Sequence, residues 1–306
     1  MRFGVLGSSG LLGKAVSKRL AQERAETVGT SLSAGVDLRD LAATRKWFAE
    51  NRPEIVLNCA AYVGGIQFGL DHPIELFDNN LQMTLNIYRC CAEFQVRRLV
   101  NPISNCIYPA RATLFRESEV WDGPLDRSVL IYGMARKTHF IGSVAYRMQG
   151  RLDSMNIVLP NMYGPGDHFD PVRSHALGGL IRRIVSAHRT GAPQVEIWGT
   201  GAPVREWLYI DDGARAMLAG TAAGSTDDLI NVGTGVGYSI LETARKIGEI
   251  VGYRGEFVCD PSRPDGAPYK TLDGTRGRTH LQWEPLVSFE DGLKRTIEWY
   301  LECYPA

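Results

Sequence analysis

The feature that most constrains the fold is a glycine-rich turn directly after the first apolar segment. Residues 3–6 read as a short buried strand, and a helical pattern begins at Lys14. Between them glycine recurs at every third position, at Gly7, Gly10 and Gly13. This spacing permits a tight turn, close approach of the backbone to a pyrophosphate, and close packing of the next helix, whose N-terminus faces the phosphates. The chain is therefore expected to begin with a dinucleotide-binding unit.

Further apolar segments alternate with amphipathic stretches along the first half of the chain. The segments are 27–29, 55–57, 99–100 and 157–159. Strands that alternate with helices predict a doubly wound parallel sheet of the Rossmann type, an α/β fold with helices on both faces.

A second, smaller α/β lobe is expected because the amino-acid composition of the sequence changes after Pro160. Residues 164–167 are rich in glycine and proline, which marks a boundary. The chain is expected to return to the sheet near Trp207–Asp212 and Leu229–Gly233. The predicted dinucleotide domain is 1–163 with 206–235, and the discontinuous substrate lobe is 164–205 with 236–306.

Composition argues against several classes of partner, although a local basic patch stays open. Lys plus Arg and Asp plus Glu balance at 34 each, so no overall field favours nucleic acid or an anionic membrane. No segment approaches the ~20 apolar residues of a membrane helix, so a cytoplasmic location is expected. Six cysteines are scattered without a C-x-x-C pair, which favours reduced thiols and no metal site.

Chemically versatile side chains follow the predicted strands. Ser104 and Cys106 come directly after the apolar residues 99–100, and Tyr132 opens a helical pattern with Arg136 one turn later. Ligands of open sheets bind beyond the carboxyl ends of the strands, so this is where chemistry is expected. Taken alone, Cys106 would more often be a buried structural residue.

Several runs of sequence together resemble the GDP-L-fucose synthases, a family of extended short-chain dehydrogenases. Tyr132 with Arg136 is similar to the Tyr-x-x-x-Lys element of that superfamily, although the lysine here is Lys137, which points about 100° away. The resemblance extends over nearly the whole chain. Its other segments are 60–66, 104–109, 161–165, 174–175, 182–183, 198–201, 205–206, 231–235, 263–266 and Lys270.

The resemblance implies an oxidoreductase that is also an isomerase of a GDP-4-keto-6-deoxy sugar, producing GDP-L-fucose or a related GDP-deoxysugar. Hydrogens on the carbons beside the ketone can be removed as protons, and inversion needs a base and an acid on opposite ring faces. Cys106 is assigned as the base and His175 as the acid. Ser104 and Tyr132 would hydrogen-bond the carbonyl oxygen, with Arg136 supplying the cation beside Tyr132.

The same resemblance assigns the binding residues and a homodimer. Arginines suit the diphosphate of a GDP-sugar because their planar fork binds two oxygens at once. The substrate-binding residues are Asn161, Arg183, Trp198, Arg205 and Lys270. The cofactor-binding residues are Gly7, Ser9, Gly10, Leu11, Gly13, Thr30, Leu38, Asp40, Ala60, Ala61, Asn161 and His175.

The cofactor side departs from the family pattern. Members that use NADPH tend to carry arginines where this chain has Ser9 and Thr30, yet no acidic residue follows residues 27–29 to bind a free ribose hydroxyl. The family alone favours NADP(H) over NAD(H). Two alternatives stay open: an NAD-dependent epimerase or oxidase of another nucleotide sugar without net reduction, and a noncatalytic dinucleotide-binding protein.

Overall fold

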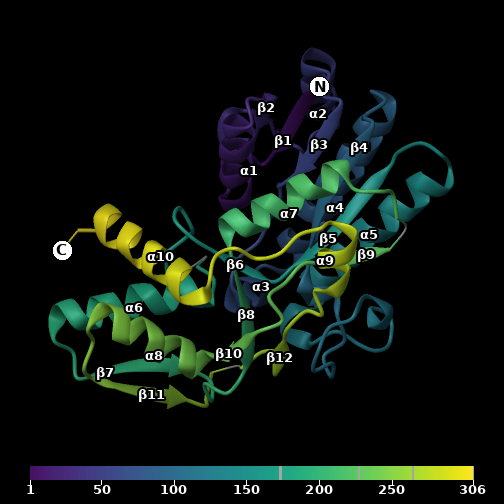
Figure 1. The fold of residues 1–306 in the computed structure, drawn as a ribbon. Helices are drawn as coiled ribbons and strands as arrows, with labels where there is room; N and C mark the ends of the chain where they lie inside the picture. Colours follow the sequence, from purple (N-terminus) through teal and green to yellow (C-terminus); the bar gives the residue numbers. More distant parts are fainter. Residues whose placement is uncertain (172–173, 227, 264, 306) are drawn as a thin grey trace.

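A parallel six-stranded sheet forms the centre of the molecule (Figure 1). The computed structural model describes residues 1–171, 174–226, 228–263 and 265–305. The strand order reverses between β1 and β3, because β2 pairs with one edge of β1 and β3 with the other. Open sheets bind ligands at such a switch point. In spatial order the strands are β2 (Glu26–Thr30), β1 (Arg2–Leu6), β3 (Ile55–Asn58), β4 (Arg98–Ser104), β5 (Ser154–Leu159) and β9 (Leu229–Asn231).

Helices cover both faces of this sheet. Successive strand residues point to opposite faces, and both sets are apolar, so each face needs a covering layer. Val5 and Leu57 pack on one face, and their neighbours Leu6 and Val56 pack on the other. Burial on both faces explains why the strands read as continuous apolar runs. Helices α1 (Leu11–Gln22) and α7 (Ile210–Ala222) lie on the first face, and α2 (Leu41–Asn51), α4 (Pro73–Glu93) and its neighbour α5 (Leu130–Met148) on the second.

A second lobe has its own apolar core. Ile181, Ile247 and Leu293 meet there from three helices that pack on short strands. The lobe is seen at the lower left of Figure 1. Its elements are α6 (Ala176–Thr190), α8 (Ile240–Val251), α10 (Phe289–Cys303) and the paired strands β7 (Gln194–Trp198) and β11 (Glu256–Asp260).

A four-stranded sheet connects the two parts. Strand β8 (Val204–Tyr209) pairs with β10 (Gly237–Ser239), β12 (Tyr269–Lys270) and β6 (Asn161–Tyr163). The described part also contains two short α-helices, α3 (Ile66–Asp71) and α9 (Thr275–His280), and four single-turn 3-10 helices. Within that part, no helix is both long and apolar enough to cross a membrane.

One expectation about the central sheet is wrong and another is confirmed. Residues 207–209 belong to β8 of the four-stranded sheet, and Ile210 begins helix α7 instead of continuing a central strand. The apolar run there is buried because Leu208 packs in the core of the central sheet, and Trp207 and Tyr209 pack in the core of the second lobe. Leu229–Asn231 does return to the central sheet, beside β5.

The buried carboxylate of Glu206 ties three chain segments together. Its Oε1 accepts hydrogen bonds from the Thr234 hydroxyl at 3.0 Å, the Thr234 amide and the Gly235 amide at 3.0 Å. Its Oε2 accepts from the Leu272 amide at 2.7 Å. Burial raises the pKa of Glu206, and these hydrogen bonds act in the opposite direction. The carboxylate thus fixes the segments after β9 and after β12 against β8.

Replacing Glu206 by glutamine should lower the free energy of unfolding by about 2 kcal/mol, because an amide NH₂ would face the Leu272 amide and leave a buried donor unpaired. Urea denaturation measures the loss. Glu256→Gln, at an exposed position of β11, is the control and should change stability by less than about 0.5 kcal/mol. Equal stability of the two variants would contradict the role given to Glu206.

Candidate active site

The glycine turn has the geometry that the sequence predicts. Gly7 has a φ of +74°, and a Cβ there would lie 2.7 Å from the backbone of Ala60. A Cβ on Gly13 would lie 2.1 Å from the Gly7 carbonyl oxygen. Gly10 is the N-cap of α1 without a side-chain cap, so the first amides of the helix, from Leu11 on, are available to an anion. The turn fits a dinucleotide pyrophosphate.

Ala60 and Ala61 lie two and three residues after the end of β3, at the same edge of the sheet as the turn. The Ala60 amide donates to Asn58 Oδ1 at 3.2 Å, which fixes the loop where it passes Gly7. Both alanines therefore lie where the strand order reverses. Their expected contact with the cofactor is compatible with this position and stays a prediction.

Hydroxyl groups gather beyond the ends of β1 and β2. Ser33 Oγ donates to Ser9 Oγ at 2.9 Å, and it lies 3.0 Å from Ser31 Oγ. Thr30 is buried, and its carbonyl accepts from the Ser8 amide at 2.9 Å. Arg39 is held by Asp37 in an ion pair of 2.6 Å, so its charge is already matched. This corner offers polar hydrogen-bonding groups with little free positive charge.

Two other residues expected to bind the cofactor have structural roles. The Asp40 carboxylate caps α2 by accepting from the Ala42 and Ala43 amides at 2.7 and 3.3 Å. Leu38 is buried in the core beneath α2 and α4. Their assignment to the cofactor stays a prediction, although their local contacts explain both residues without a ligand.

Ser104, Cys106 and Tyr132 are brought together at the end of β4. Ser104 is the last residue of that strand, and its hydroxyl accepts from the Cys106 amide at 3.2 Å. Helix α5 approaches this turn so closely that a Cβ on Gly133 would lie 2.5 Å from the Cys106 carbonyl oxygen. The neighbouring Tyr132 is thereby fixed beside Cys106, and the charge interaction between the two contributes to a raised pKa of Tyr132.

Arg136 lies one helical turn beyond Tyr132, as the sequence predicts. Its guanidinium carbon is 5.9 Å from the centre of the Tyr132 ring, and its Nη2 donates to the Pro102 carbonyl. Burial raises the pKa of Tyr132, and the Arg136 charge partly offsets that rise. Lys137 instead donates to the Val120 carbonyl at 2.6 Å and lies over Trp121. The lysine therefore points away from Tyr132, as its sequence position implies.

Lys270 has a contact that the sequence does not predict. Its ammonium donates to Cys106 Sγ at 3.3 Å across a separation of 164 residues. Only the fold brings β12 beside the turn after β4, so no local pattern could have shown this pair. Lys270 was expected to bind a diphosphate.

The two expected diphosphate arginines are held by backbone carbonyls. Arg205 donates to the carbonyls of Ala267 at 2.7 Å and Asp265 at 3.2 Å. Arg183 donates to the Glu196 carbonyl at 2.9 Å and lies over Trp198, with 5.5 Å between guanidinium carbon and ring centre. Burial lowers the pKa of both arginines, so each cation is poorly hydrated and would gain from an anionic partner.

Trp198 is 44% exposed at the end of β7, where Arg263 lies over its ring at 5.2 Å in addition to Arg183. Asp265 fixes the adjoining turn, since its carboxylate accepts from the Thr200 amide at 2.7 Å and hydroxyl at 2.9 Å. Sequence reasoning singled out Trp198 but gave no role to Arg263 or to the Asp265 carboxylate. Pro264, in the same run, lies outside the described residues.

His175 caps the start of α6 without a side-chain hydrogen bond to that helix. The loop after β3 passes close by, since a Cβ on Gly65 would lie 2.9 Å from the Ser174 carbonyl oxygen. Burial lowers the pKa of His175, and His168 adds to the effect. A neutral imidazole is therefore favoured. Asn161 donates to the Glu206 carbonyl at 3.2 Å and so joins β6 to β8.

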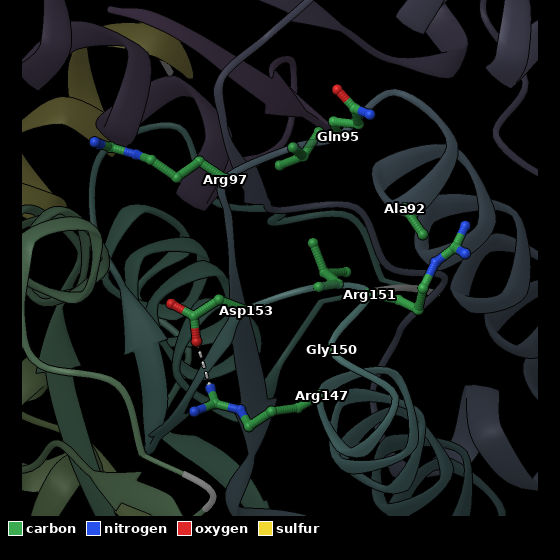
Figure 2. Close-up of a pocket in the computed structure, with 9 residues that line it drawn as sticks. Ala92, Gln95, Arg97, Arg147, Gly150, Arg151 and Asp153 are labelled. Carbon is green, nitrogen blue, oxygen red and sulfur yellow. Dashed lines mark ion pairs between the residues drawn. The ribbon is translucent and has the colours of Figure 1, made fainter.

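A pocket at the opposite edge of the sheet is unrelated to these groups. It is lined by Arg97, Arg147 and Asp153, near the amino ends of β4 and β5 (Figure 2). Asp153 pairs with Arg147 at 2.8 Å, the ion pair drawn in Figure 2, and with Arg98 at 2.6 Å. Ser104 and Asn161 lie at the carboxyl ends of the same strands. The pocket therefore belongs to the structural side of the sheet.

Known proteins are similar to this chain over nearly its whole length. The GDP-L-fucose synthase of Escherichia coli (strain K12) is 34% identical over 311 residues, which cover 98% of this chain and 97% of that protein. A GDP-6-OMe-4-keto-L-xylo-heptose reductase from C. jejuni has a TM-score of 0.92 at 26% identity, covering 99% and 98% of the two chains. A GDP-L-fucose synthetase from Naegleria fowleri, solved with NADP bound, has a TM-score of 0.87 at 27% identity, covering 99% and 94%.

The resemblance inferred from the sequence motifs is thus confirmed along nearly the full chain. The pattern of the NAD dependent epimerase/dehydratase family matches residues 4–233, which include the glycine turn, the end of β4 and Tyr132. The chain belongs to the NAD dependent epimerase/dehydratase family.

Proposed function

We propose that this protein is an NAD(P)H-dependent epimerase and reductase of a GDP-4-keto-6-deoxy sugar, forming GDP-L-fucose or a related GDP-deoxysugar. The observation that carries the proposal is the grouping of Ser104, Cys106 and Tyr132 at the end of β4, on the edge of the sheet that holds the glycine turn. The nearly full-length similarity to a GDP-L-fucose synthase and to a GDP-heptose reductase supports the substrate class.

In the proposed epimerisation, Cys106 removes a proton from a carbon beside the ketone. The electrons of the broken C–H bond pass to the carbonyl oxygen as an enolate. Ser104 and Tyr132 donate hydrogen bonds to that oxygen and stabilise its charge. His175, in which burial favours the neutral imidazole, first takes up a proton from solvent and then delivers it to the opposite face of the ring, which inverts the carbon.

In the proposed reduction, Tyr132 donates its phenolic proton to the oxygen on carbon 4. A reduced nicotinamide, when bound, supplies hydride to that carbon. The residues that would hold the cofactor are those of the glycine turn, with Ala60 and Ala61 beside it. Arg183, Arg205 and Trp198 would hold the GDP part of the substrate, because two desolvated guanidinium groups suit a diphosphate.

The direct test is the absorbance of the reduced nicotinamide when purified protein meets GDP-4-keto-6-deoxymannose with NADPH and, separately, NADH. Loss of the signal together with a new GDP-sugar product is the expected result. Turnover with neither cofactor would count against the reductase.

The cofactor corner, formed by the hydroxyls of Ser9, Ser31 and Ser33, has no charge selective for NADP and so supports a second function. This is an NAD-dependent epimerase or oxidase of another nucleotide sugar that carries out no net reduction. An epimerase of this kind would exchange protons beside the ketone with solvent without steady consumption of NADPH. An oxidase would pass hydride from another nucleotide sugar to NAD⁺, so reduced cofactor would accumulate. A noncatalytic dinucleotide-binding protein would do neither. Deuterium incorporation from heavy water, measured beside cofactor consumption, distinguishes the three.

Cofactor choice is proposed to favour NADP(H), as supported by the relative that was solved with NADP bound. In this chain Ser9, Ser31 and Ser33 would hydrogen-bond the 2′-phosphate without neutralising it. Ser9→Arg should therefore lower the KM for NADPH relative to NADH by about tenfold, since a charge-assisted hydrogen bond is worth roughly 1.5–3 kcal/mol. Steady-state kinetics with both cofactors measures the ratio. Ser9→Gln is the uncharged control, and an unchanged ratio in the arginine variant would contradict the assignment.

We further propose that residues 1–163 with 206–235 bind the dinucleotide and that 164–205 with 236–306 bind the sugar nucleotide, in a cytoplasmic enzyme. The division is supported by the separate apolar core of α6, α8 and α10. Proteolysis with and without each ligand tests it, because each ligand should protect its own segments.

A homodimer is proposed from exposed apolar side chains on the adjacent helices α4 and α5. Those on α5 recur at seven-residue intervals and so share one face. The residues are Ile74, Phe77 and Leu85 on α4 and Met134, Ile141 and Met148 on α5.

Light scattering should give a mass twice the 33.8 kDa of one chain, and Ile141→Glu should reduce it to one chain by placing a charge in the contact. Leu286→Glu, at another exposed apolar position, is the control and should leave the mass unchanged. A monomeric parent protein would exclude the dimer.

A further inference from the structure

Lys270 is a buried cation whose partner is a thiol. Its side chain is 6% exposed, and its ammonium donates to Cys106 Sγ at 3.3 Å. Among the described residues, Cys106 supplies the one hydrogen-bond acceptor to this ammonium, and no carboxylate lies within ion-pair distance of it. A buried ammonium without a counter-charge is costly. A neutral thiol is a weak acceptor and would not offset that cost.

Both members of the pair are held in place by backbone contacts. Lys270 sits opposite Arg205 in the parallel pairing of β12 with β8, and the Leu272 amide two residues later is fixed by Glu206 at 2.7 Å. Cys106 is fixed by the bond from its amide to Ser104 and by the close packing of Gly133. The approach of nitrogen to sulfur is therefore part of the fold and needs no ligand to form it.

The other charged and titratable groups near Cys106 add to the same field. Arg205 is buried beside Lys270, and Cys106 opposes the effect of burial on the pKa of Arg205. Asp126 and Asp265 also act on Arg205, whose guanidinium already donates to the Asp265 carbonyl. Tyr132, on α5, is close enough to Cys106 for the two groups to interact electrostatically. Two cations thus lie close to the sulfur, which favours a negative charge there.

We propose that Lys270 is a positioning residue that holds Cys106 as a thiolate, so that the two side chains form an ammonium–thiolate pair before substrate binds. This rests on the proposed function for its catalytic meaning. The thiolate forms an S–H bond with the proton taken from the carbon beside the ketone, and the C–H electrons become the enolate. Lys270 keeps all its protons. After turnover the thiol returns its proton to solvent, and His175 regains one from solvent.

The pair is tested without any sugar by alkylation with iodoacetamide over a range of pH. Mass spectrometry follows Cys106, with the exposed Cys303 as an internal reference. In the parent protein, alkylation of Cys106 should reach its half-maximal rate at a lower pH than that of Cys303. In Lys270→Met the rate at Cys106 should fall about tenfold at pH 7, while Cys303 is unaffected. Lys270→Arg should retain most of the reactivity.

Lys137→Met is the matched control, because it removes another buried lysine that has no contact with Cys106. It should leave the Cys106 profile unchanged. The ultraviolet absorbance of the thiolate, taken as the difference between the parent and Cys106→Ser, gives a second measurement that does not depend on access of the reagent.

Kinetic measurements distinguish a positioning role of Lys270 from a role as a ligand of the substrate diphosphate. With GDP-4-keto-6-deoxymannose, Lys270→Met should lower kcat for solvent deuterium exchange and leave KM nearly unchanged. An unaltered alkylation profile with a raised KM would make Lys270 a diphosphate ligand and overturn the proposal, as would absence of thiolate absorbance at pH 7. A thiolate in a protein that turns over no GDP-sugar would instead refute the proposed function alone.

Discussion

Cys106→Ser should lower the rate of solvent deuterium exchange beside the ketone by roughly 10²- to 10⁴-fold, the usual contribution of a general base. A serine hydroxyl occupies nearly the same place but does not ionise near neutral pH. The variant therefore has no base at this position, even beside Lys270. Reduction of the ketone should suffer much less. Nuclear magnetic resonance measures the exchange, and nicotinamide absorbance measures the reduction.

The reaction product also shows whether Cys106 acts only in epimerisation or in reduction as well. When epimerisation is slow and reduction continues, the variant should release a GDP-6-deoxysugar reduced at carbon 4 with carbons 3 and 5 not inverted. Cys303→Ser, at the exposed end of α10, is the control and should behave as the parent. Equal loss of exchange and reduction would show that Cys106 supports the whole site and is not a separate base.

The glycine turn is an element of the fold that could be predicted from the sequence alone. Gly7, Gly10 and Gly13 predicted a strand, a turn and a helix, and the structure has β1, the turn and α1 in that order, although α1 begins at Leu11, three residues before the predicted Lys14. The prediction succeeded because local geometry restricts two of these positions to glycine: Gly7 has a φ of +74°, and a Cβ on Gly13 would meet the Gly7 carbonyl oxygen. The position of Arg136 one turn after Tyr132 followed from helical periodicity in the same way.

Contacts between distant segments could not be read in this manner. The run at residues 207–209 is apolar whichever sheet it joins, so its membership of β8 depends on pairing with β6 and β10. The same holds for Lys270, whose neighbours in sequence do not indicate a thiol. The residue types of the candidate site could be predicted from the sequence. Their contacts, such as that of Lys270 with Cys106, depend on the pairing of strands in the four-stranded sheet.

The cofactor corner and the end of β4 also differ in how firmly their residues are fixed. Ser9 and Ser33 are joined by a hydrogen bond between their exposed hydroxyls. Ser104, Cys106 and Gly133 are fixed by backbone contacts. We therefore expect substitutions at the corner to change cofactor preference and substitutions at the end of β4 to change the chemistry itself.

Tyr132→Phe should lower the rate of ketone reduction by roughly 10²- to 10⁴-fold, because the phenol is the proposed proton donor to the oxygen on carbon 4. Burial raises the pKa of Tyr132, more than the nearby Arg136 lowers it. The phenol therefore keeps its proton at neutral pH and can donate it. Exchange beside the ketone should fall less, since Ser104 still hydrogen-bonds the enolate oxygen. Single-turnover oxidation of the reduced cofactor measures the first effect, and deuterium incorporation the second.

The sign of the Tyr132 pKa shift makes a further distinction possible. A donor must be protonated, so reduction in the parent should be constant through neutral pH and decline only where the phenol ionises, above its ordinary range. The phenylalanine variant should lack that decline. Tyr253→Phe, which removes a hydroxyl bonded to the Ala192 carbonyl in the second lobe, is the control. Normal reduction in Tyr132→Phe would remove the phenol from the mechanism and leave Ser104 or a water molecule as the proton source.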